Sequence, residues 1–212
     1  MATLPAVPYT ATMPKHAPAF YFDFTDPGSR LATHLIDEAG AANTVEWRAF
    51  ELRPPPRPLI DPTSADWSAY HARAVKCARE FGVPMQAPQF VPWTRKAHEL
   101  AEFAREGDCY HAVRRALFEA HFVDRTDIGR IDLLVDIAHR AGLDRTEAKA
   151  VLDVDRFTGV VLEQREAARE HGVTTVPALV VGGRRLEGLA TMAETTRWTR
   201  WIGNELTAET NK

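Results

Sequence analysis

The sequence has 212 residues, of which 45% are hydrophobic, so it is long enough to bury a sizeable core and little of it is expected to be disordered. Its 26 basic and 29 acidic side chains are spread along the chain with a formal net charge of -3 and no basic stripe, so nothing in the sequence indicates binding to nucleic acid or to a membrane surface. No stretch approaches the roughly 18 uninterrupted apolar residues of a membrane span, and the start does not resemble a signal peptide, so we expect a cytoplasmic protein.

The first predicted elements follow a Pro-rich tail over residues 1–18. A short aromatic strand is predicted over 19–24, and a helix with an apolar stripe follows it and ends at Gly40. A second strand covers 44–52. Five prolines between residues 53 and 66 then break the pattern, and the chain changes character.

Residues 67–172 are predicted to form successive helices, because Asp or Thr opens most of the segments and Gly closes several of them. Strand signals return over 176–189, where Gly182 and Gly183 suit a two-residue hairpin turn. A last helix follows. The order of elements is therefore strand, helix, strand, a long helical stretch, hairpin and helix.

Three groups of segments carry a resemblance to the DsbA-like disulfide oxidoreductases. FDFTDPGS (22–29) stands where that family has a strand followed by Cys-Pro-x-Cys. GVTTVPALVVGG (172–183) is similar to the family's Gly-Val-x-x-Val-Pro segment. VEWRAFEL (45–52), AHEL (97–100) and LFEAHFVDRTDI (117–128) resemble its FrnE-like branch.

The resemblance, with the order of elements, implies an α/β protein with a thioredoxin-like fold. A large all-helical insertion separates the βαβ half of that fold from the ββα half. The thioredoxin-like domain is then formed by residues 19–66 and 173–208, and the helical insertion domain by 67–172.

The junction between the first strand and helix carries the family's redox cysteines, and here Asp26 and Ser29 take the two positions. A carboxylate accepts the same N–H bonds at a helix N-terminus as a thiolate, but it does not exchange with a disulfide, and a hydroxyl does not resolve one. We therefore expect no dithiol exchange there. Asp26 is either an ordinary helix cap before Pro27 or, with Ser29, part of a reassigned catalytic site.

Related kappa glutathione transferases and 2-hydroxychromene-2-carboxylate isomerases have Ser-Pro-x-Ser at this junction, and the first serine steers the sulfur of glutathione. An ionised Asp26 would repel a glutathione thiolate, so sulfur activation requires a protonated Asp26 or a transfer of the task to Ser29. Arg30, together with Arg53 and Arg57, is a candidate to bind the carboxylates of glutathione.

The resemblance also implies a cis bond between Val176 and Pro177. Such a bond leaves the N–H and C=O of Val176 without strand partners, pointing across at Asp26 and Ser29 and free for an extended ligand. Trp93 stands where relatives commonly have Asn, so its ring either fills part of a substrate cleft or packs in a loop.

Cys77 and Cys109 lie on segments with helical periodicity, belong to no Cys-x-x-Cys motif, and are expected to be inert core thiols. His98 begins HELAE, which lacks the second histidine of the HExxH zinc motif, so no metal site is predicted.

Three functional classes remain open on the sequence. The first is a DsbA-family protein, an oxidoreductase by descent, that has lost its cysteine pair. The second is a glutathione-dependent isomerase or transferase with a remodelled site, and the third is a non-catalytic module that binds a small thiol or an extended peptide. Glutathione is the one cofactor that these classes imply, and the oligomeric state is left open, with a dimer as one option.

Overall fold

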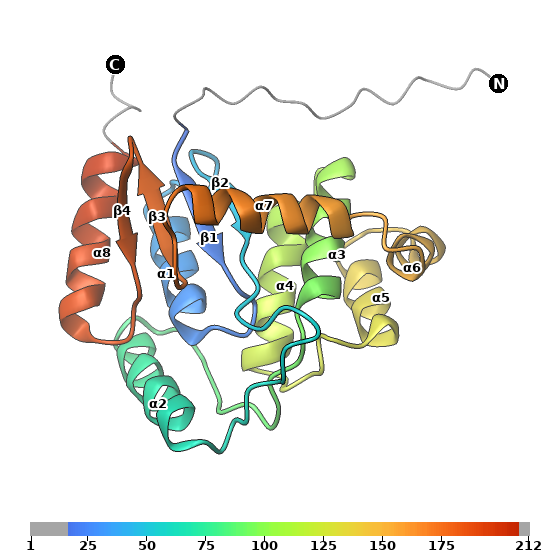
Figure 1. Ribbon diagram of the computed structural model, residues 1–212, viewed down its shortest axis with the longest axis horizontal. Helices are drawn as coiled ribbons and strands as arrows, with labels where there is room; N and C mark the ends of the chain where they lie inside the picture. Colours follow the sequence, from blue (N-terminus) through green and yellow to red (C-terminus); the bar gives the residue numbers. More distant parts are fainter. Residues whose placement is uncertain (1–16, 208–212) are drawn as a thin grey trace.

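The computed structural model describes residues 17–207 (Figure 1). Most of the predicted tail, residues 1–16, and the last residue of the predicted 173–208 segment lie outside this range. Four strands form one sheet in the order β2-β1-β3-β4, with β1 parallel to β2 and antiparallel to β3. The strands are β1 (Ala19–Phe22), β2 (Glu46–Ala49), β3 (Ala178–Val181) and β4 (Arg184–Glu187).

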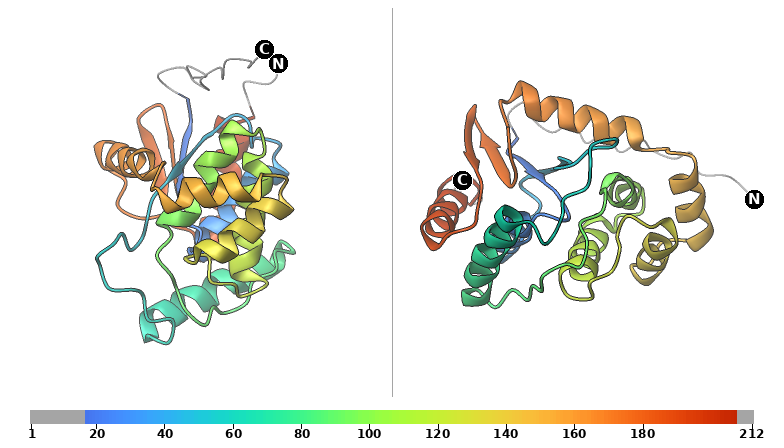
Figure 2. Two further views of the ribbon diagram at one scale, coloured as in Figure 1. Left: turned by 90° about the vertical axis from the view of Figure 1, so that its right-hand side faces the viewer. Right: turned by 60° about the horizontal axis from the view of Figure 1, so that its bottom comes forward.

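Eight helices complete the described part of the chain. They are α1 (Pro27–Glu38), α2 (Ala65–Glu80), α3 (Arg95–Glu106), α4 (Tyr110–Phe122), α5 (Ile131–Arg140), α6 (Arg145–Asp153), α7 (Thr158–Glu170) and α8 (Met192–Glu205). The right-hand view of Figure 2 shows the sheet and α8 at one end of the molecule and α5 and α6 at the other. The predicted α/β fold is confirmed. No helix within residues 17–207 is long and apolar enough to cross a membrane.

The first two strands are shorter than predicted because a side chain replaces the strand hydrogen bonds beyond them. β1 ends at Phe22, and the carboxylate of the next residue, Asp23, accepts the backbone N–H of Thr25 at 2.8 Å. The same carboxylate accepts the N–H of Leu52 at 2.7 Å, past the end of β2. Asp23 thus ties the ends of both strands together, directly before the start of α1.

The hairpin between β3 and β4 turns where predicted. Gly182 and Gly183 both have positive φ, 54° and 77°, which is the backbone conformation of a two-residue type I′ turn. The pairing places Val181 opposite Arg184 across this turn. Glycine is needed at both positions because a side chain is strained at positive φ.

The sheet has two faces because side chains alternate along its strands. Phe20 and Phe22 face the main core with α1 and α8, whereas Tyr21 and Val180 face a second cluster that includes Ala168 of α7. α7 therefore covers one face of the sheet, as Figure 1 shows, although the predicted boundary at residue 172 counts it with the insertion. α7 therefore belongs to the insertion by sequence and to the packing of the sheet by contact.

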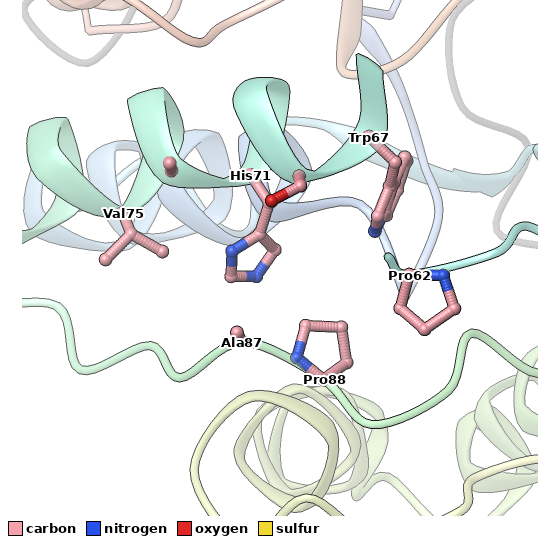
Figure 3. Close-up of a pocket in the computed structure, with 8 residues that line it drawn as sticks. Pro62, Trp67, His71, Val75, Ala87 and Pro88 are labelled. Atoms are coloured by element: carbon pink, nitrogen blue, oxygen red, sulfur yellow. The ribbon is translucent and has the colours of Figure 1, made fainter. Parts of the chain in front are cut away.

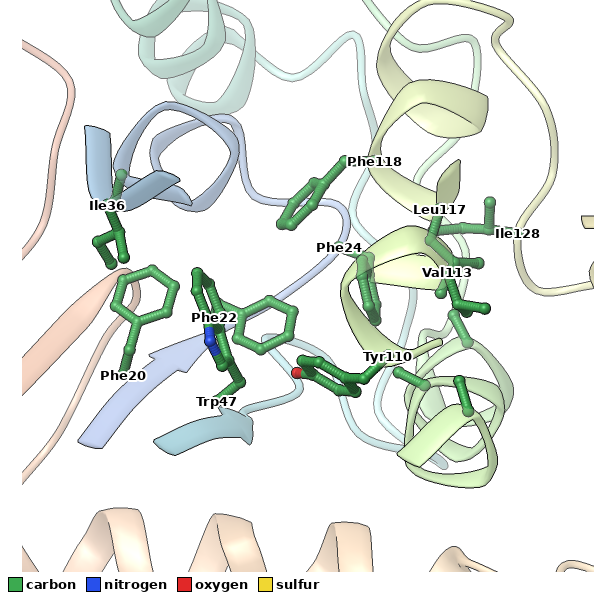
Figure 4. Close-up of a cluster of buried hydrophobic side chains, with 14 of the residues drawn as sticks. Phe20, Phe22, Phe24, Ile36, Trp47, Tyr110, Val113, Leu117, Phe118 and Ile128 are labelled. Carbon is green, nitrogen blue, oxygen red and sulfur yellow. The ribbon is translucent and has the colours of Figure 1, made fainter. Parts of the chain in front are cut away.

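The main core runs without a break from the sheet into the insertion (Figure 4). The ring of Phe22 lies 5.9 Å from that of Trp47 on β2 and 5.8 Å from that of Phe118 on α4, and Phe24 lies 5.0 Å from Phe118. These aromatic contacts hold the strand that leads into α1 against α4. The start of α1 is consequently fixed from both parts of the fold.

Candidate functional site

Asp26 is the N-cap of α1, and its carboxylate is engaged by three donors. Its φ and ψ of -88° and 116° are extended, and Pro27 takes the first helical position. Oδ2 accepts the backbone N–H of Ser29 at 2.5 Å and the Ser29 hydroxyl at 2.6 Å. Oδ1 accepts the hydroxyl of Tyr70 at 2.6 Å. Asp26 is 1% exposed, so this is a buried network.

Ser29 has no free hydrogen-bonding capacity directed at solvent. Its hydroxyl donates to Asp26, accepts the backbone N–H of Asp23 at 3.3 Å, and the residue is fully buried. The two positions that carry sulfur in the family therefore carry two oxygen side chains bonded to each other. The structure brings together the predicted pair Asp26 and Ser29.

Tyr70 is the residue of this site that the sequence does not reveal. It lies on α2, 44 positions along the chain from Asp26, and no motif marks it. Burial raises the pKa of its hydroxyl well above the usual value, and the neighbouring Asp26 raises that pKa further. Tyr70 therefore stays a protonated donor to Asp26 at physiological pH.

The space above the first turn of α1 is filled. A methyl group built on Gly28 would lie 2.5 Å from the carbonyl oxygen of Leu189, 2.7 Å from the Tyr70 hydroxyl and 2.9 Å from Cδ of Pro177. Only glycine fits there, because three neighbours converge on its Cα. The Tyr70 hydroxyl, the carbonyl oxygen of Leu189 and the ring of Pro177 therefore all lie against the first turn of α1.

Two carboxyl groups of the site have pKa values raised toward neutral pH. Burial raises the pKa of Asp26 to about 7, against the lowering effect of its hydrogen bonds to Ser29 and Tyr70. Burial likewise raises the pKa of Asp23 to about 6, and Asp23 in turn raises that of Asp26. The hydroxyl of Thr94 donates to Asp23 at 3.2 Å. A buried carboxyl that titrates near pH 7 is suited to exchange protons.

The Val176–Pro177 peptide bond is cis, and its proline lies against Gly28. The C=O of Pro177 accepts the N–H of Gly188 at 2.9 Å. Within the described part of the chain, no hydrogen bond reaches the N–H or C=O of Val176. Val176 is only 2% exposed, however, so the predicted ligand edge is covered.

Other predicted ligand contacts point elsewhere. The guanidinium of Arg30 lies over the ring of Phe118, 5.9 Å from its centroid, and not beside the Asp26 carboxylate. Arg53 and Arg57 are exposed on the Pro-rich loop. Trp93 is 42% exposed and donates its Nε1–H to the C=O of Arg57 at 3.0 Å. The structure thus places Trp93 against a loop and does not bring it to Asp26.

The two cysteines are free and lie in the helical part, Cys77 on α2 and Cys109 at the N-cap of α4. Burial raises the pKa of both thiols. His98 is 2% exposed between Phe22 and Phe24, and burial lowers its pKa to about 3. Among residues 17–207, no three His, Cys, Asp or Glu side chains are grouped to hold a metal ion.

The chain is similar to a known family of proteins. The DSBA-like thioredoxin domain matches residues 19–197. The uncharacterised protein YwbO of Bacillus subtilis (strain 168) is 31% identical over 177 residues, which are 80% of this chain and 88% of that protein.

Two solved structures illustrate the range of proteins that share the fold. A probable DsbA oxidoreductase from Streptomyces coelicolor has a TM-score of 0.70 at 22% identity, over 89% of this chain and 90% of that chain. A 2-hydroxychromene-2-carboxylate isomerase has a TM-score of 0.66 at 20% identity, over 92% of this chain and 99% of that chain. At these identities the likeness shows the fold alone.

Proposed function

The chain belongs to the DSBA-like thioredoxin domain family. We propose that it catalyses proton transfer at the site where the disulfide oxidoreductases of the family exchange disulfides. At the family level the fold serves oxidoreductases and isomerases. The observation that carries the proposal is the hydrogen bond between Asp26 and Ser29 at the two former cysteine positions. Oxygen side chains do not exchange with a disulfide.

The remaining thiols support the same conclusion. Cys77 is 3% exposed and donates to the C=O of Ala190, while Cys109 donates to the C=O of Ala104. A disulfide-exchanging cysteine needs a lowered pKa and access to solvent, whereas burial raises the pKa of both of these thiols. Neither is suited to replace the missing pair.

The proposed chemistry is proton transfer with a small thiol, and glutathione is the first ligand to try. A carboxyl with a pKa of about 7 is present in both forms at neutral pH. In its neutral form Asp26 does not repel a thiolate, and in its ionised form it accepts a proton from a ligand. This fits an isomerase better than an oxidoreductase, since an isomerase returns every proton and electron that it takes.

A ligand that reaches Asp26 has to displace or share the Tyr70 hydroxyl. The Tyr70 hydroxyl donates to Asp26 and lies against Gly28 in the first turn of α1. α2, which carries Tyr70, packs on α1, so a shift of α2 away from α1 would open the site. A non-catalytic peptide-binding role is a second candidate, because the backbone of Val176 has no partner among the described residues. Val176 is 2% exposed, so a peptide would first have to displace the residues that cover it. The FrnE-like branch and a cytoplasmic location stay predictions.

Insulin reduction with dithiothreitol tests the loss of redox chemistry. We expect the chain to give no turnover above buffer, and the double variant Asp26→Cys with Ser29→Cys to gain turnover, because it restores Cys-Pro-Gly-Cys at a helix N-terminus. Turnover by the unmodified chain that disappears in Cys77→Ser or Cys109→Ser would contradict the proposal.

Titration calorimetry with glutathione separates the two ligand roles. If glutathione binds, Tyr70→Phe should change its affinity and Asp26→Asn should abolish the pH dependence of binding near pH 7. If short extended peptides bind while glutathione does not, the peptide-binding role is favoured. Binding of neither would contradict a ligand role for this site.

A further inference from the structure

Helix α2 and the segments beside it form an excursion from the rest of the fold. Residues 50–64 and 81–94, which flank α2, contain no helix or strand, and one isolated bridge pairs Ile60 with Val91. The chain therefore leaves the fold and returns to it at neighbouring points, with α2 between them. Among the other helices and strands, α1 is the one that α2 contacts most.

Little apolar surface attaches α2 to the rest of the protein. It has 16 residues, and those that are buried are His71, Ala74, Cys77 and Ala78. Burial stabilises in proportion to the apolar area removed from water, and three of these four side chains are small. The hydrogen bond from Tyr70 to Asp26 is therefore an important part of what holds α2 against α1.

Two cavities lie along α2. The first, of about 200 Å³, is lined by Trp67 and Val75 of the helix and by the rings of Pro62 and Pro88 (Figure 3). The second, of about 340 Å³, is lined by Val75 and by residues 82–86 of the segment that follows the helix. These cavities leave space for α2 to change its position.

Asp26 lies beneath α2. It is 1% exposed, and the hydroxyl of Tyr70 donates to its Oδ1 at 2.6 Å. Asp23 at the end of β1 faces it as well, and Glu194 of α8 acts on the Tyr70 hydroxyl. The guanidinium of Arg30 on α1 lies over an aromatic ring of α4. The neighbours of the carboxylate are therefore acidic or neutral, and its negative charge is costly while α2 covers it.

Exposure to water would remove that cost. The pKa of the buried Asp26 carboxyl is about 7, against 3.8 for the ordinary group. When α2 moves away, the pKa of the exposed carboxyl returns toward 3.8 and the proton is released, so a rise in pH between these values favours the open form. Below about pH 4 the carboxyl is protonated in both forms and does not favour opening.

We propose that α2 is a hinged lid over Asp26 and that ionisation of the Asp26 carboxyl opens it. The hinge is formed by the two segments that meet at Ile60 and Val91, and the Tyr70 hydroxyl is the latch that opening breaks. A ligand then meets Asp26 as a carboxylate, which is the form that accepts a proton. The inference concerns access to the site and needs no reaction there, so it can fail while the proposed function holds.

The reactivity of Cys77 reports the opening. This thiol lies on α2, is 3% exposed and donates to the C=O of Ala190 in the loop before α8, so it becomes accessible when α2 leaves that loop. We label it with 4,4′-dithiodipyridine in the Cys109→Ser protein and divide its rate by the rate after Asp26→Asn is added. This ratio should rise roughly tenfold from pH 6 to pH 8. The division cancels the titration of the thiol and of His71, which both proteins share.

Two further measurements separate a lid from other causes of labelling. Tyr70→Phe removes the latch and should speed the labelling of Cys77 at pH 6 about threefold to tenfold. Dilute urea should change the rate little, because a lid exposes little surface when it opens, whereas global unfolding exposes much and depends steeply on urea. A ratio that stays flat from pH 6 to pH 8, no effect of Tyr70→Phe, or labelling as sensitive to urea as global unfolding would each overturn the proposal.

Discussion

The two sides of helix α2 differ in how completely their polar atoms are paired. On one side, Tyr70, Ser29 and Asp26 form a closed network in which each side chain has a partner and no space is left. On the other side, Trp67 and His71 line a cavity of about 200 Å³, and Nε1 of Trp67 and Nε2 of His71 are buried without a hydrogen-bond partner. The side that matches the family's redox site is the closed one, and the side with no counterpart in any motif is the one that is open.

A position that matches the family's active site is therefore not by that fact open to a ligand. A ligand at Asp26 has to break the 2.6 Å hydrogen bond from Tyr70. The two sides of α2 differ in whether their buried polar atoms have hydrogen-bond partners.

The largest expected effect is a fall in stability with rising pH. The pKa of Asp26 is about 7 in the folded chain, against 3.8 for the ordinary carboxyl. Between these values the folded state binds more protons than the unfolded state, so the stabilisation is complete below about pH 4 and is lost as the pH rises through 7. The free energy of unfolding should fall by roughly 4 kcal/mol from this group, and Asp23 should add to the fall up to about pH 6.

Urea melts between pH 4 and pH 8 measure this fall. Asp26→Asn is the control, because its side chain does not titrate, and it should flatten much of the slope. A free energy of unfolding that rises from pH 4 to pH 7 would contradict a buried, protonated Asp26 and would remove the contrast between the two sides of α2.

The next largest loss of stability is expected when the carboxyl acceptor of Asp26 is removed. At pH 5, Asp26→Ala should lower the free energy of unfolding by about 2 to 3 kcal/mol, because the helix loses its cap and the hydroxyls of Ser29 and Tyr70 lose their acceptor. Asp26→Asn keeps one carbonyl oxygen and should lose less. Urea melts of the three proteins measure the difference, and equal stability would show that the network contributes nothing.

A smaller effect is expected for the partner on α2. Tyr70→Phe should lower the free energy of unfolding by about 1 kcal/mol, since it removes one buried hydrogen bond and keeps the ring. Combined with Asp26→Asn in a double-mutant cycle, the two changes should be non-additive, because they remove parts of one interaction. Strict additivity would mean that Tyr70 does not hold Asp26 and that α2 is free to leave the site.

Much of the fold could be predicted from local sequence signals. Asp26 before Pro27 indicates the start of a helix, and Gly182 with Gly183 indicates the hairpin, because cap and turn geometry depend on only a few consecutive residues. The strand ends could not be predicted, since the first strand stops where Asp23 bonds to Leu52, far along the chain. Local patterns carry no information on such a partner.

The same limit applies to the site. Asp26 and Ser29 could be selected from their positions, but the role of Tyr70 depends on where a helix in the insertion packs. The sequence makes Arg30 a candidate ligand contact and leaves Trp93 either in a cleft or against a loop. In the structure Trp93 donates to the C=O of Arg57, and the guanidinium of Arg30 lies over the ring of Phe118. Burial, which sets the pKa of Asp26, is likewise a property of the whole fold.

The pKa of the Asp26 carboxyl in the folded chain decides whether this site can transfer protons. Carboxyl carbon chemical shifts followed by NMR from pH 3 to pH 9, with Asp26→Asn to assign the signal, give its pKa in the folded chain. We expect a midpoint of about 7, because burial raises the pKa of Asp26 against the lowering effect of its hydrogen bonds to Ser29 and Tyr70. A midpoint at or below the ordinary carboxyl value of 3.8 would identify Asp26 as a permanently ionised helix cap and would contradict a proton-transferring site.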